Sequence, residues 1–136
     1  MLLLKGMLKN MKKTKILDAN AILRYILYDI PEQADIIENI IKDEIFILPE
    51  VIMEVIFALY KFYKIPRKEV SEEILRFLIE VNCDNKIIIN AVKNFGIINL
   101  DFVDCLLLEY SRDNKYKIVT FDKDLIKFIN KRVQHD

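Results

Sequence analysis

Apolar residues along the chain alternate between short continuous runs and longer stretches with helical spacing. Residues 13 to 18 form a short run that ends at an acid, and apolar side chains then recur with helical spacing as far as Leu27. This pattern predicts a buried strand followed by a helix. Pro31 stands where a second helix is expected to begin, and residues 44 to 48 read as a second strand. The order predicted for this part is βαβ.

The middle of the chain is predicted to be helical. A helix expected from Pro49 is apolar on nearly every side, as in buried helices, and Pro66 ends it before an amphipathic helix. Another helix is expected up to about Phe95, with Gly96 as its C-cap. The last two helices are expected after Leu100 and after the acid at position 122.

Further strands are expected around residues 81 to 83 and over residues 116 to 121. Strands separated by helical stretches, without hairpin signals, predict a parallel sheet covered on both faces. We therefore expect the α/β class, as one three-layer α/β/α domain with a central parallel sheet over residues 11 to 136. Residues 1 to 10 precede the regular pattern and are expected to form a loose extension.

Composition narrows the class of protein. The 136 residues are 53% hydrophobic, enough for one core, and 21 basic residues balance 21 acidic ones. Any polyanionic partner must therefore meet a local patch or bound cations. No signal peptide or membrane span is readable. Cys83 and Cys105 form no CxxC pair and are expected to be small buried hydrophobes, which fits a reducing cytoplasm.

The scarcity of histidine and glycine excludes several enzyme classes. The single histidine, His135, is the penultimate residue, which argues against catalytic triads and HExxH zinc sites. The only glycines are Gly6 and Gly96, so neither a Walker A loop nor a GxGxxG turn can be written. Carboxylates are the chemical groups that remain in quantity.

Four acids stand among strongly apolar neighbours, where a carboxylate is costly unless something holds it. They are Asp18, Glu54, Asp104 and Asp122. Asp18 and Asp122 each follow a predicted strand. Because ligand crevices of open parallel sheets lie beyond the carboxyl ends of the strands, we expect these two to be neighbours in space. Asp101 lies three residues before Asp104 on the same helix face and is a further candidate.

Carboxylates gathered in one crevice repel each other unless a cation neutralises them, and clusters of oxygen ligands suit Mg²⁺ or Mn²⁺. Such cations generate hydroxide from water and stabilise charge on a leaving phosphate oxygen. The four acids therefore predict metal-dependent hydrolysis of phosphodiester bonds. The alternative for Asp18, Asp101 and Asp122 is helix capping, and for Glu54 a solvent-facing edge of its helix. The residues alone leave both open.

The four motifs ILDANAILRYIL, PEVIMEVIFAL, LDFVDCLLLEYS and IVTFDKDL, in this order and at these spacings, resemble the PIN-domain ribonucleases, especially the VapC-type toxins of toxin–antitoxin pairs. The resemblance spans residues 15 to about 129. It implies a PIN-like α/β/α nuclease that cleaves RNA with Mg²⁺ or Mn²⁺, forms a homodimer and is inhibited by a small antitoxin protein.

The resemblance also implies roles for single residues. The metal-binding acids of the family would be Asp18, Glu54, Asp104 and Asp122, with Asp101 as an extra acid. Asn20 and Thr120 would orient the carboxylates or water.

The basic residues are spread thinly along the chain, and RNA contact through them is a weaker expectation. The candidates are Arg24, Lys61, Lys64, Arg67 and Lys68. A solvated helix end explains the group at 61 to 68 equally well. Any antitoxin is expected to lie across the helices around Tyr60, Phe62 and Tyr63, unless these rings belong to the core. The alternatives to a toxin are an RNA-processing PIN nuclease without an antitoxin and a non-catalytic binding module of the same fold.

Overall fold

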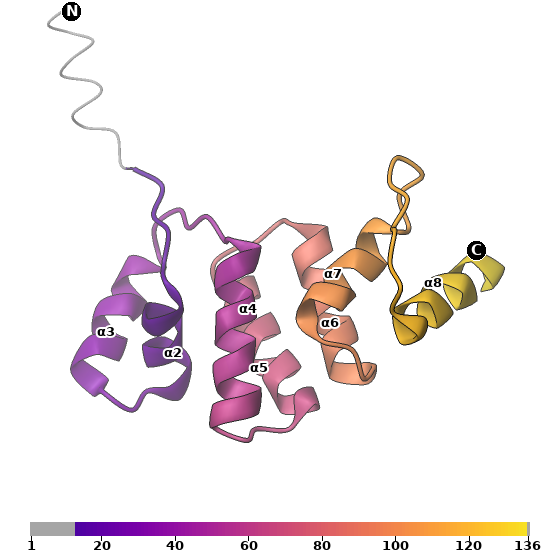
Figure 1. Cartoon of the computed structure of the whole chain (residues 1–136). Helices are drawn as coiled ribbons and strands as arrows, with labels where there is room; N and C mark the ends of the chain where they lie inside the picture. The colour runs from indigo at the N-terminus through magenta and orange to yellow at the C-terminus, as the bar shows by residue number, and fades with distance from the viewer. Residues whose placement is uncertain (1–12, 136) are drawn as a thin grey trace, which may run out of the picture.

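The computed structural model describes residues 13 to 135, and the side chains of residues 13 to 131. The extension expected over residues 1 to 10 lies outside this part. Figure 1 shows a row of packed helices with α2 and α3 at one end and α8 at the other. The elements are α2 (Ala19–Leu27), α3 (Pro31–Ile40), α4 (Pro49–Phe57), the π-helix η1 (Ala58–Phe62), α5 (Arg67–Glu80), α6 (Lys86–Ile97), α7 (Phe102–Tyr110) and α8 (Lys123–His135).

The predicted central sheet is not confirmed. Between residues 13 and 135, strand pairing is limited to one parallel bridge that joins Lys15 and Ile45. The Lys15 amide donates to the Glu44 carbonyl at 2.9 Å, and the Phe46 amide donates to the Lys15 carbonyl at 2.8 Å. The parallel direction agrees with the predicted βαβ order, but a lone bridge lacks the third strand that makes a sheet stable.

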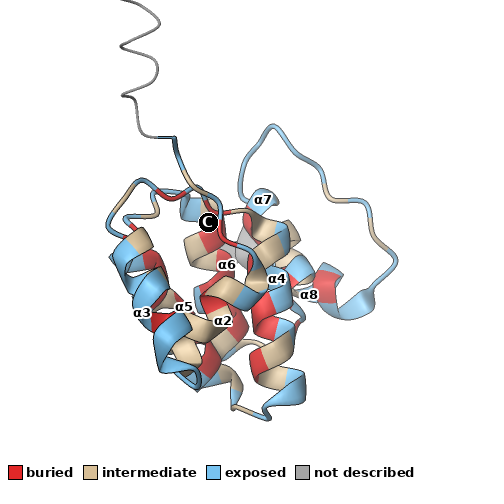
Figure 2. Ribbon diagram, turned by 90° about the vertical axis from the view of Figure 1, so that its left-hand side faces the viewer, coloured by how far each residue is buried: buried red, intermediate tan, exposed pale blue. Residues whose placement is uncertain are grey.

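The two other predicted strands are absent from the described chain. Residues 81 to 83 form a turn after α5, where Asn82 takes a left-handed conformation with φ 55°. Residues 116 to 121 are unpaired and belong to the exposed loop between α7 and α8 (Figure 2). Val119 is 85% exposed and Phe121 98% exposed. The three-layer α/β/α architecture was predicted from apolar runs in the sequence. An apolar run indicates that a segment tends to be buried, but it does not specify which neighbouring element buries it.

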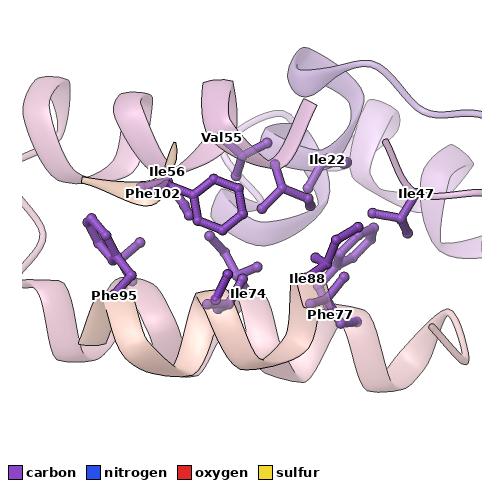
Figure 3. Packing of buried hydrophobic residues seen from close by; sticks show 14 of the residues in the cluster. Ile22, Ile47, Val55, Ile56, Ile74, Phe77, Ile88, Phe95 and Phe102 are labelled. Atoms are coloured by element: carbon purple, nitrogen blue, oxygen red, sulfur yellow. The ribbon is translucent and has the colours of Figure 1, made fainter. Parts of the chain in front are cut away.

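Helices supply the core instead. The buried face of α4 carries Ile52 and Val55, and α4 packs against both α2 and α7. On the other side, α5 and α6 pack along each other and bury Ile74, Phe77 and Ile88 (Figure 3). The helix that was read as apolar on nearly every side is nevertheless buried on one face alone, because Met53 is 40% exposed and Phe57 is 66% exposed.

Gly96 sits where α5 and α6 cross. A Cβ atom at this position would lie 2.6 Å from the Ser71 Cβ and 2.8 Å from the Ser71 Oγ. The Ser71 hydroxyl donates to the Val92 carbonyl at 2.9 Å and ties the two helices together. The prediction of Gly96 as a C-cap was wrong, because α6 continues to Ile97. The absence of a side chain serves helix packing.

The long helix expected from Pro49 changes its winding near its end. After Phe57 the chain continues as η1, in which the Tyr63 amide donates to the Ala58 carbonyl at 2.9 Å, five residues earlier. Wide turns of this kind are rare and often occur at functional sites. Pro66 occupies the N-cap position of α5 without a side-chain hydrogen bond and so marks the boundary that the sequence predicted before this helix.

Candidate functional site

Three of the singled-out acids are helix caps. The Asp18 carboxylate accepts from the Ala21 amide at 2.8 Å, and Asp101 accepts from the Asp104 amide at 2.8 Å. Asp122 accepts from the Leu125 amide at 3.0 Å. The capping bonds considered for these three acids are therefore all present. Each cap uses Oδ1 alone, and it fixes the carboxylate at the positive end of a helix while Oδ2 lies outside the capping bond.

Asp104 lies close to two other acids. Burial raises the pKa of the Asp104 carboxyl above its ordinary value, and the charges of Asp101 and Asp122 raise it further. The starts of α7 and α8 are therefore close enough for the charges of Asp101 and Asp122 to act on Asp104. We call Asp101, Asp104 and Asp122 the acidic trio.

Asp18 and Glu54 lie outside the trio. Asp18 lines a shallow depression between α2 and α3, and Glu54 is exposed on α4. Across the described residues, no three Asp, Glu, His or Cys side chains are near enough to hold one metal ion. The donor chemistry fits Mg²⁺ or Mn²⁺, since every candidate ligand is an oxygen. The expected edge where Asp18 meets Asp122 requires residues 116 to 121 to pair, and they are unpaired here.

The two expected orienting residues have different partners. The Thr120 hydroxyl accepts from the Asp122 amide at 3.0 Å and so fixes the approach to that acid. The Asn20 side chain instead accepts from Arg24, from Nε at 3.3 Å and Nη2 at 3.2 Å. Arg24 also forms an ion pair with Asp29. Its guanidinium is therefore occupied by protein partners.

Arg67 has a structural role that the sequence did not indicate. Its Nε donates to the Phe95 carbonyl at 2.9 Å and its Nη2 donates to the Leu100 carbonyl. The guanidinium also lies 3.8 Å from the centroid of the Phe95 ring. These contacts join the start of α5 to the end of α6 and the approach to α7. They use the planar, multidentate geometry that distinguishes arginine from lysine.

The lysines of the basic group are exposed. Lys61 lies 5.0 Å from the centroid of the Tyr60 ring. Lys64 adopts a left-handed conformation with φ 60°, in the turn before α5, and Lys68 is in the first turn of α5. Lys61 and Arg67 border a cavity.

That cavity, of about 390 Å³, lies between α4, η1 and the first turn of α7. Its floor is apolar, and Ile56, Phe95 and Phe102 are found at the same end of the core (Figure 3). Asp101 of the acidic trio is among the residues that line it. Sequence patterns gave no sign of the cavity, although Lys61 and Arg67 on its wall were candidates.

One comparison with known protein families gave a match. A family model described as PIN domain matches residues 15–131. No curated protein and no solved structure matches the chain. Among the described helices, none is long and apolar enough to cross a membrane.

Proposed function

The chain belongs to the PIN domain family, whose members are generally metal-dependent nucleases, and we propose that it is an endoribonuclease that requires Mg²⁺ or Mn²⁺. The observation that carries the proposal is the acidic trio. As described, these side chains are not near enough to hold one metal ion, but the charges of Asp101 and Asp122 act on Asp104, and a divalent cation drawn between them would relieve that repulsion.

We assign metal binding to Asp101, Asp104 and Asp122, with Asp18 and Glu54 as the remaining ligands. When bound, the metal would supply an activated water and neutralise charge on the phosphate. The caps hold Asp18, Asp101 and Asp122 rigidly, so their free oxygens are oriented before substrate arrives. Thr120 orients Asp122 through its amide.

Asp18 and Asp122 come together, in this proposal, when residues 117 to 121 pair beside Ile16. The amide and carbonyl of Lys15 form hydrogen bonds with residues 44 and 46. Because backbone groups of successive residues in an extended chain face opposite sides, the amide and carbonyl of Ile16 point away from residues 44 to 46. Ile16 is exposed, as are Val119 and Phe121. A parallel pairing would join the backbone groups of the two segments and bring Asp18 and Asp122, which follow them, to one edge.

We further propose that the protein is a cytoplasmic, homodimeric toxin controlled by a small antitoxin. The aromatic pair Phe62 and Tyr63, with ring centroids 5.1 Å apart, supports such a partner because Phe62 is 76% exposed. Tyr60 packs edge-on against Phe95 and belongs partly to the core. A short antitoxin-like reading frame directly beside the gene would distinguish a toxin from a processing nuclease.

The test is cleavage of labelled single-stranded RNA with Mg²⁺ or Mn²⁺, beside an EDTA control. Asp18→Asn and Asp104→Asn are expected to lose activity while remaining folded by circular dichroism. Glu69→Gln, which removes an acid from the first turn of α5, is the matched control and is expected to keep activity. If the wild type cleaves no single-stranded or structured RNA with either metal, the chain is better described as a binding module of the same fold.

A further inference from the structure

The cavity beside the acidic trio has the shape and chemistry of a small-molecule site. Its 390 Å³ lies within the range of pockets that bind small organic ligands, roughly 300 to 1,000 Å³. The floor is buried, whereas Phe57 on the rim is 66% exposed. Polar groups, including the Asn99 amide and the Lys61 ammonium, are present among the lining residues. An apolar floor with a few polar groups around it is typical of a binding pocket.

The π-helix η1 forms one side of this cavity. Tyr60 and Lys61 both belong to η1 and both line the cavity. The Tyr60 ring is held by an edge-on contact with Phe95, at 5.6 Å between centroids and 89° between planes. Because π-helical turns are less stable than α-helical ones and recur at functional sites, their position here is an independent indication of binding.

The lining groups are of the kinds that bind an unpaired nucleotide. Aromatic rings bind single-stranded bases by stacking, and the exposed Phe57 offers such a ring. Lys61 supplies an exposed cation for a phosphate beside the Tyr60 ring, whereas Arg67 is committed to two backbone carbonyls and to Phe95. Asn99 is exposed and its amide carries both donors and an acceptor for a base edge.

We propose that this cavity binds one unpaired base of an RNA strand, with Phe57 stacking on the base and Lys61 contacting the adjoining phosphate. Asp101 lines the cavity and belongs to the acidic trio, so a base bound here places the next phosphate beside the carboxylates. The identification of RNA as the ligand rests on the proposed function. Base binding itself requires neither metal nor cleavage.

The experiment measures binding without chemistry. Anisotropy of a short fluorescein-labelled RNA is recorded in EDTA with the wild type, Phe57→Ala and Phe62→Ala. Phe57→Ala is expected to weaken binding about tenfold, the loss of one base stack. Phe62→Ala is the matched control, because Phe62 is also an exposed aromatic on this segment but does not line the cavity. It is expected to bind as the wild type does.

A second series places one abasic nucleotide at each position of the RNA. The wild type is expected to lose affinity at one position, and Phe57→Ala is expected to be insensitive there. Equal affinities of Phe57→Ala and Phe62→Ala would overturn the proposal. The proposal would also be overturned if Phe57→Ala changed the oligomeric state and left the RNA affinity unaltered. The cavity would then be a contact between two copies of the protein. If the protein binds RNA as expected but cleaves none, the proposed base site stands and the proposed nuclease activity is wrong.

Discussion

The crossing of α5 and α6 offers a sharp test of the packing, because it depends on one missing side chain. Gly96→Ala would place a Cβ atom 2.6 Å from the Ser71 Cβ. That atom is fixed to the α5 backbone and cannot rotate away, so the helices must separate. The third neighbour, the Arg67 carbonyl oxygen at 3.8 Å, is at ordinary contact distance.

Two effects of opposite sign decide the result. Overpacking a well-packed contact costs roughly 1 to 3 kcal/mol. Alanine is favoured over glycine within a helix by about 1 kcal/mol, and Gly96 lies inside α6. We therefore expect Gly96→Ala to lower the free energy of unfolding by about 1 kcal/mol, the clash exceeding the gain in helix propensity.

The sign is expected to reverse once the obstacle is removed. Ser71→Gly deletes both atoms that the new methyl group would meet, so Gly96→Ala in that background is left with its propensity gain of about 1 kcal/mol. Urea unfolding followed by circular dichroism gives all four corners of the double-mutant cycle. Lys93→Ala, on the exposed side of α6, is the control and is expected to change stability little. The same effect of Gly96→Ala in both backgrounds would refute the close approach.

Three further predictions concern polar side chains that the fold buries wholly or in part. The Asp104 carboxyl, with its raised pKa, binds protons more readily in the folded state than in the unfolded chain, so its contribution to stability falls as pH rises above 3.8. Asp104→Asn should remove this contribution from the pH profile of thermal melts, and identical profiles would contradict it. Burial raises the pKa of the Cys105 thiol to about 12, so a thiol reagent should modify the half-buried Cys83 in the native protein and reach Cys105 only after unfolding. Asn94→Leu removes a 2.6 Å hydrogen bond to the buried Glu109 carboxylate. The free energy of unfolding in urea should fall by roughly 1.5 to 3 kcal/mol, and an unchanged value would mean that the bond adds nothing to stability.

The helix starts were predictable because their signals are local. Asp18 and Asp101 were identified as possible caps from the residues that follow them, and both bonds are present. Pro66 was read correctly as the boundary before α5. A cap needs only its own first turn, so a short window of sequence contains the whole interaction.

Features that depend on distant partners were not predictable in this way. The apolar run at 116 to 121 resembles a buried strand, but burial of a strand requires neighbours that the run itself does not specify. Gly96 was assigned to a helix end because its contact with Ser71, 25 residues earlier in the numbering, cannot be read from local pattern. The cavity was missed for the same reason, since Phe57 and Asn99 meet only in the folded chain.

The unpaired segment between α7 and α8 also bears on how the protein behaves at high concentration. An extended apolar run with free backbone groups is a template on which another chain can add a strand, and such edges promote aggregation unless a charge interrupts them. Val119 and Phe121 stand fully in solvent on this run, with no charged residue between Ile118 and Phe121. The segment that is proposed to complete the catalytic edge within one molecule could therefore also pair with another molecule. Assembly of the site and solubility of the protein thus depend on the same few residues.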